Sequence, residues 1–233
     1  MSIRPTYTSL YQKLGEIIAL WASCIFGYYT ILPLFGLQLS YNSSPIAIAV
    51  YFLLWSALAT VYFWDVFARW LRIDRRIWVY SATSLLFAGL IWILLYLFTF
   101  LPAVNGLLAA PYTDILFATP WYFLPKAAEI LLQQLLIAVL VLELSFRLRS
   151  LKQVVLGYAV CFGLIHVFLF LFTGAPVLYA TIMTSAALLS ASVFPYLILR
   201  VRGGFVYAYV IQLVFYILLA MFLHAWPPPG YGV

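Results

Sequence analysis

Residues 121–152 read WYFLPKAAEILLQQLLIAVLVLELSFRLRSLK. The part from 121 to 146 is almost entirely apolar, and it is longer than the roughly 20 residues with which an α-helix crosses ~30 Å of hydrocarbon. It is followed at once by three basic residues, Arg147, Arg149 and Lys152. An apolar helix with a basic boundary is typical of a membrane span whose charged end faces the cytoplasm.

The same pattern recurs along the chain and predicts an all-α, polytopic transmembrane helix bundle of about seven spans. The 233 residues are 67% hydrophobic and only 8% charged, whereas a soluble domain carries about 25% charged residues. Because so few charges cannot cover a globule of this size, lipid must be the solvent for most of its surface. We expect one transmembrane domain over 1–233, with spans at 14–38, 46–67, 78–104, 121–146, 153–173, 176–199 and 204–225.

Basic residues occupy alternate connections, and this alternation predicts the orientation. All but one of the 12 basic residues lie before the first span or in the second, fourth and sixth connections. The positive-inside rule then places the N-terminus in the cytoplasm and the C-terminus outside a cell membrane, such as the prokaryotic inner membrane. The exception is Lys126, near the outer end of the fourth span, which we expect to snorkel outwards. The other basic residues are Arg4, Lys13, Arg69, Arg72, Arg75, Arg76, Arg147, Arg149, Lys152, Arg200 and Arg202.

These features also exclude several classes of function. The net charge of +6 is confined to short connections. None of them is long enough for a surface that reads bases, so we expect no nucleic-acid partner. Cys24 and Cys161 lie inside predicted spans and outside any CxxC motif, which favours apolar packing. Since no cluster of metal-ligating residues is evident, we expect neither a metal nor another cofactor.

Ionisable residues inside the spans need a physical reason, since a charge at the bilayer centre costs about 2.5–3.5 kcal/mol on insertion scales. Glu16, Asp65 and Glu143 fall near the cytoplasmic edge, where interfacial roles explain them. Glu143 is also four residues before Arg147, the spacing of a helical ion pair. Glu129, in the fourth span, lies deeper.

The fourth span carries a polar face. Lys126, Glu129 and Gln133 are spaced i, i+3 and i+7, so they share one side of a helix. Glu129 lies ~12 Å from the outer end of its span, and His166, in the next span, lies ~10 Å from the same side. Two interpretations stay open: a Lys126–Glu129 ion pair with a separate hydrogen-bonded histidine, or a polar centre in which Glu129 and His166 meet. Gln212, ~12 Å into the last span, favours an interhelical hydrogen bond and could join that centre.

These polar residues also carry a family resemblance. Residues 128–136, AEILLQQLL, resemble the E-E-x-x-x-R-G signature of the CAAX-protease and bacteriocin-processing (CPBP, or Abi) family of intramembrane proteases. Residues 162–166, FGLIH, resemble the second motif of that family, F-x-x-x-H. Residues 203–216 are similar in placement to the third, a glycine followed by H-x-x-x-N. The resemblance covers a CPBP-like core at 126–216.

The departures from the family pattern bear on activity. The resemblance implies that the first glutamate activates water, that the histidine assists it and that third-motif residues stabilise the oxyanion. Here Ala128 stands at the first glutamate position and Gln133 at the arginine position, while Gln212 and Tyr216 replace the third-motif pair. An alanine cannot take a proton, and general base catalysis supplies about 10²–10⁴-fold. We therefore expect a catalytically inactive relative.

Three functions follow as hypotheses. The first is a membrane scaffold or partner-binding subunit, in contact with membrane lipid and another integral membrane protein. The second is an active, metal-independent intramembrane peptidase that uses Glu129 and His166, with Gln212 as the candidate oxyanion donor. The third is a small transporter, although no repeat or paired broken helices are evident. The partners of Glu129 and His166 in the folded chain discriminate between the first two.

Overall fold

The computed structural model describes residues 9–70, 77–104, 114–173 and 177–227. Within these residues the chain is helical and contains no strand, which confirms the all-α prediction. Arg4, Arg72, Arg75 and Arg76 lie outside the described residues. The helices are α1 (Leu10–Phe26), η1 (Gly27–Ile31, π-helical), α2 (Leu32–Leu34), α3 (Pro45–Tyr62), α4 (Trp64–Trp70), α5 (Ile77–Phe98), η4 (Pro120–Tyr122, 3-10), α6 (Phe123–Arg147), α7 (Leu151–Thr173), α8 (Val177–Arg200) and α9 (Gly204–Ala225).

Five segments among the described residues are long and apolar enough to cross a membrane: Leu10–Leu34, Pro45–Tyr62, Pro120–Arg147, Tyr179–Arg200 and Gly204–Ala225. Within the described side chains, the apolar parts of α5 and α7 are shorter and extend over Leu85–Phe98 and Leu151–Val167. The chain is therefore a candidate multi-pass membrane protein. The full seven-span threading, with its inside and outside ends, stays a prediction.

Two of the expected spans end earlier than the hydropathy pattern suggests. The first, expected to reach residue 38, ends at Leu34, since Gly36 has a φ of 76°, the left-handed conformation that terminates helices. The second, expected to reach residue 67, is interrupted at Phe63, and the short helix α4 follows. Hydropathy does not register either break because the residues around both are apolar.

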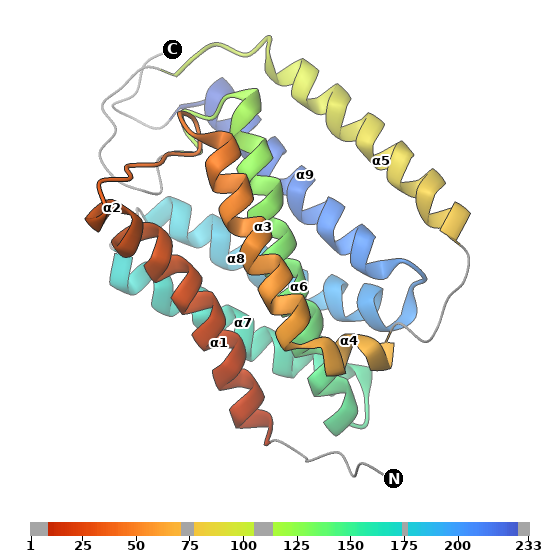
Figure 1. Cartoon of the computed structure of the whole chain (residues 1–233). Coiled ribbons are helices and arrows are strands. Elements are labelled where there is room, and N and C mark those ends of the chain that lie inside the picture. The colour runs from red at the N-terminus through yellow and green to blue at the C-terminus, as the bar shows by residue number, and fades with distance from the viewer. Residues whose placement is uncertain (1–8, 71–76, 105–113, 174–176, 228–233) are drawn as a thin grey trace.

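The helix α6 forms the centre of the bundle. Of the 18 residues in its most apolar stretch, 78% are buried, whereas in the other four candidate spans the buried share is 17–39%. Figure 1 shows α3 lying along α6, α5 at the periphery beside α9, and the α7–α8 pair crossing behind α1 and α3. Because other helices surround α6, the polar residues that it carries are buried among them, Lys126, Glu129 and Gln134 included.

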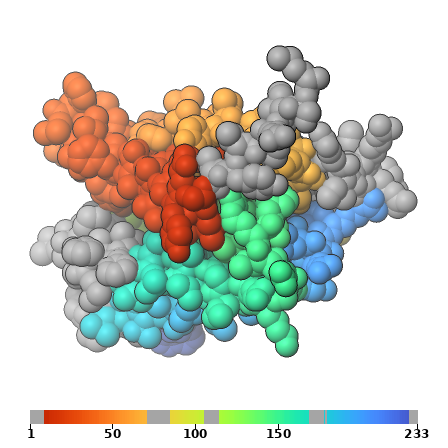
Figure 2. Space-filling view, turned by 90° about the horizontal axis from the view of Figure 1, so that it is seen from below, coloured from red at the N-terminus to blue at the C-terminus, as the bar shows by residue number. Residues whose placement is uncertain are grey.

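One end of the bundle gathers charged side chains. α1 begins there, and α4 and α6 end there (Figure 1). Seen from that end, the last turns of α6 lie in the middle of the surface (Figure 2). Glu143 is 3% exposed and binds both Arg69, at 3.0 Å, and Arg147, which confirms the predicted i,i+4 pair. The shared carboxylate thus ties α4 to α6 at the end that the basic residues predict to be cytoplasmic.

This orientation predicts opposite labelling of two exposed serines. In a chain with Cys24→Ala and Cys161→Ala, Ser43→Cys lies between the first two candidate spans, and Ser150→Cys lies in the turn between α6 and α7. We expect a membrane-impermeant maleimide added to intact cells to label position 43 and to label position 150 only after permeabilisation, because basic turns stay inside. Labelling of position 150 in intact cells would contradict the orientation.

Candidate functional site

Glu129 is the centre of a buried polar cluster on α6. The residue is buried, at 8% exposure. Oε2 accepts hydrogen bonds from Nζ of Lys126, at 2.6 Å, and from the hydroxyl of Tyr41, at 2.8 Å. Oε1 accepts from Nε2 of Gln133, also at 2.8 Å. The predicted polar face of the fourth span and the Lys126–Glu129 ion pair are therefore confirmed, since residues three and four apart meet on one helix face.

Lys126 does not snorkel outwards, and that prediction is wrong. Its side chain is buried at 9% exposure. The ammonium lies 4.5 Å from the ring centroid of Tyr216, 5.4 Å from that of Tyr41 and 6.0 Å from that of Tyr122. A cation over aromatic faces is attracted by the ring quadrupoles, and the attraction grows when water is excluded. The carboxylate and the three rings together replace the water that snorkelling would have supplied.

Tyr41 belongs to the connection between α2 and α3 and is buried at 6% exposure. Burial, and next the nearby Glu129 carboxylate, raise the pKa of Tyr41 well above its ordinary value. The hydroxyl therefore stays protonated and serves as a donor to Glu129. The neighbouring Asn42 also binds Thr119, whose backbone N–H donates to Oδ1 at 3.1 Å. These contacts fasten the α2–α3 connection over the N-terminal end of α6.

A chain of glutamine amides extends the cluster from α6 to α9. Nε2 of Gln212 donates to Oε1 of Gln133, and Nε2 of Gln134 donates to Oε1 of Gln212, both at 2.5 Å. The donor-to-acceptor direction of these hydrogen bonds follows from Glu129, because a carboxylate can only accept them. Gln133 therefore donates its amide to Glu129, and its own carbonyl oxygen accepts from the amide of Gln212. The interhelical hydrogen bond expected of Gln212 is present. Oε1 of Gln134 ends the chain, buried and without a partner among the described residues.

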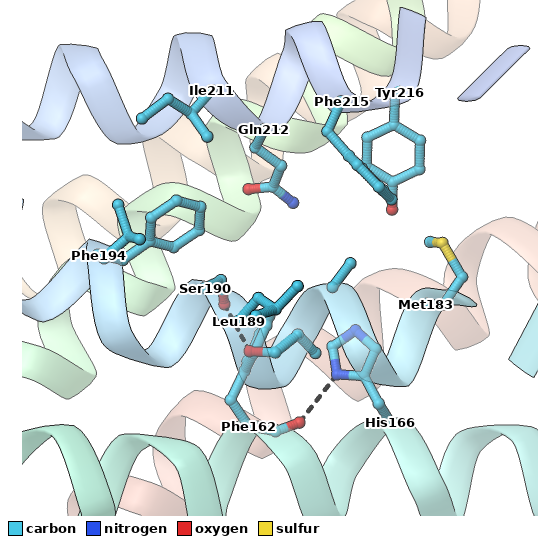
Figure 3. A pocket seen from close by; sticks show the side chains of 13 residues that line it. Phe162, His166, Met183, Leu189, Ser190, Phe194, Ile211, Gln212, Phe215 and Tyr216 are labelled. Carbon is cyan, nitrogen blue, oxygen red and sulfur yellow. Dashed lines mark hydrogen bonds between the residues drawn. The ribbon is translucent and has the colours of Figure 1, made fainter. Parts of the chain in front are cut away.

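His166 lies on α7, in the wall of a cavity of about 240 Å³ between α7, α8 and α9. Its Nδ1 is 2.8 Å from the carbonyl oxygen of Phe162. Gln212 and Tyr216 line the same cavity, whereas Glu129 is not among its lining residues (Figure 3). Of the predicted site residues, the structure thus places Lys126, Gln133 and Gln212 in the Glu129 cluster, with Tyr216 beside its ammonium. His166 faces Gln212 and Tyr216 across the cavity.

The separation of Glu129 and His166 into different surroundings follows from helix packing. α7 packs more extensively against α8 than against α6, although the α6–α7 connection is short. Equal depth on consecutive helices was the basis for the interpretation in which Glu129 and His166 meet, and depth alone does not determine which face of α7 looks towards α6. The sequence also gives no signal for Tyr41, which lies 88 residues from Glu129 in a connection rather than on a periodic helix.

Comparisons with known proteins give no relative: no family model matches the chain, and no curated protein or solved structure matches it either.

The Lys126–Glu129 pair makes a prediction about stability. Lys126→Met or Glu129→Gln alone leaves the partner charge buried, which destabilises by about 3–5 kcal/mol where such pairs have been broken. The double variant removes both charges and is expected to unfold at a higher temperature than either single variant. The measurement is the Tm of the purified protein in detergent. Lys152→Met, at an exposed position, is the control and should leave Tm unchanged; additive losses in the double variant would contradict the pairing.

Proposed function

We propose that this chain is a multi-pass protein of a cell membrane that acts without catalysis, as a scaffold or partner-binding subunit built on a CPBP-like helix arrangement. The observation that carries the proposal is that three side-chain donors already bind the Glu129 carboxylate. Lys126 and Tyr41 occupy Oε2, and Gln133 occupies Oε1. A general base must reach the proton that it abstracts, directly or through one water. Here donors from three side chains occupy the positions around the carboxylate from which a substrate or a water would have to approach.

The neighbouring positions support the same conclusion. Ala128 stands where the resemblance implies the water-activating glutamate, and it is buried at 6% exposure. Gln133, at the arginine position of the motif, is committed to the carboxylate on one side and to Gln212 on the other. These polar residues therefore support a structural role, in which Tyr41, α6 and α9 are joined across the bundle.

The outer face of α5 is the surface at which we expect a partner. Trp92 and Tyr96 lie on it and Phe100 lies in the turn just after the helix, and they are 71%, 55% and 68% exposed. The rings of Trp92 and Tyr96 are stacked at 6.2 Å, and those of Tyr96 and Phe100 meet edge to face at 5.1 Å. α5 packs against α9 and η4 and lies at the periphery (Figure 1). Exposed Trp and Tyr side chains are the commonest anchors of protein interfaces, and at this position the partner is another integral membrane protein.

A peptidase assay tests the absence of catalysis. Purified protein in lipid nanodiscs, incubated with prenylated peptides and with leader peptides, is expected to release no product above the protein-free blank, because the Glu129 carboxylate is occupied by donors. Product is measured by mass spectrometry. Turnover that disappears in Glu129→Gln and persists in Lys152→Met would establish the active-peptidase alternative instead.

Photo-crosslinking tests the partner surface. A photoreactive amino acid at Trp92 is expected to trap a discrete membrane protein in native membranes, because this side chain projects from the aromatic face of α5. The matched position is Leu54 on α3, 66% exposed, which should give only lipid adducts. The trapped protein is identified by mass spectrometry, and its co-purification with the wild-type chain should be lost in Trp92→Ala. Equal adducts at both positions would mean that the ring ladder only faces lipid.

A further inference from the structure

The cavity between α7, α8 and α9 has uncharged walls. None of the described residues that line it is Asp, Glu, Lys or Arg. Its polar groups come from Gln212 and Tyr216 on α9, Ser190 on α8 and His166 on α7. Figure 3 shows the Tyr216 hydroxyl and one ring nitrogen of His166 pointing into the space between α9 and the α7–α8 pair. Because an unpaired charge is costly to bury, these walls select a neutral occupant that makes hydrogen bonds.

The remaining walls favour a flat ring. Phe162, Phe194 and Phe215 line the cavity together with the thioether of Met183. Aromatic faces and sulfur both make favourable contacts with a further ring. An apolar cavity of about 150 Å³ is enough for benzene, so the volume of about 240 Å³ found here accommodates a six-membered ring with substituents. It is too small for most drug-sized ligands, whose sites measure about 300–1,000 Å³.

The rim indicates the route by which such a molecule would enter. Leu189 and Ile211 line the cavity and are nevertheless 70% and 46% exposed. They lie within two of the candidate spans, Tyr179–Arg200 and Gly204–Ala225. With these spans crossing a bilayer, as the proposed function has them, the cavity opens sideways towards the hydrocarbon rather than towards water. An occupant that arrives from there is lipid-soluble and leaves an apolar tail between α8 and α9.

We propose that this cavity binds the ring of an uncharged, lipid-soluble quinone or phenol. A ring oxygen accepts a hydrogen bond from the Tyr216 hydroxyl, which points into the cavity, and the phenylalanine rings and the Met183 thioether pack against the ring. The tail passes between Leu189 and Ile211. The site lies away from the α5 ring ladder and does not depend on the proposed partner, so either proposal can fail without the other.

Calorimetric titration of the full chain in lipid nanodiscs tests the site. A decyl-substituted benzoquinone is expected to bind saturably after the heat of empty nanodiscs is subtracted. Ala186→Phe fills the cavity and should abolish this binding, while Ser192→Phe, at an exposed position outside the lining of the same helix, should retain it. Tyr216→Phe keeps the ring that faces Lys126 and removes only the hydroxyl, so it should weaken binding by up to about tenfold, the equivalent of one hydrogen bond.

Two further ligands separate the features that are recognised. Decylbenzene keeps the ring and tail without oxygens, and 1-decanol keeps the tail and a hydroxyl without the ring; both are expected to bind at least about tenfold more weakly than the quinone, since each loses one set of contacts. Equal binding of 1-decanol would overturn the ring assignment. Equal binding of decylbenzene would overturn the hydrogen bonds. An Ala186→Phe variant with wild-type Tm and wild-type quinone binding would overturn the site itself.

Discussion

A charge buried away from water must find its counter-charge and its hydrogen bonds inside the protein, and this constraint organises the half of the bundle around the start of α6. Lys126 and Glu129 lie on the most buried helix, α6. They satisfy each other at 2.6 Å, but an isolated buried pair rarely recovers the full cost of its desolvation. The additional partners are therefore essential: aromatic rings around the ammonium, and a tyrosine and a glutamine on the carboxylate.

These partners come from different parts of the chain, so the hydrogen bonds and ring contacts of the Lys126–Glu129 pair also hold those parts against α6. Tyr41 brings the α2–α3 connection onto α6, and Gln212 and Tyr216 bring α9. The other end of α6 is also held by ionic contacts, since there one carboxylate, Glu143, binds two arginines from α4 and α6. α6 is thus fastened near both ends by ionic contacts, and by apolar packing between them.

The sequence was sufficient for those features that depend on short-range periodicity. Hydropathy located the five candidate spans to within a few residues at most ends, and the i, i+3, i+7 spacing placed Lys126, Glu129 and Gln133 on one face. It was insufficient where long-range packing decides. The hydroxyl of Tyr41 reaches Glu129 across 88 residues, and this contact, with the surrounding rings, is why Lys126 is buried instead of snorkelling. The face that α7 turns towards α6 is likewise a property of the assembled bundle.

The amides of Gln133, Gln212 and Gln134 all point the same way, each turning its NH₂ group towards Glu129. Dipoles aligned head to tail polarise one another. The negative charge of the carboxylate is consequently felt well beyond its own oxygens, as an enriched electron density on the carbonyl of each successive glutamine. Gln212, which lines the cavity between α7, α8 and α9, is one of these, so the charge buried on the central helix also polarises one side chain in the wall of a cavity that it does not line.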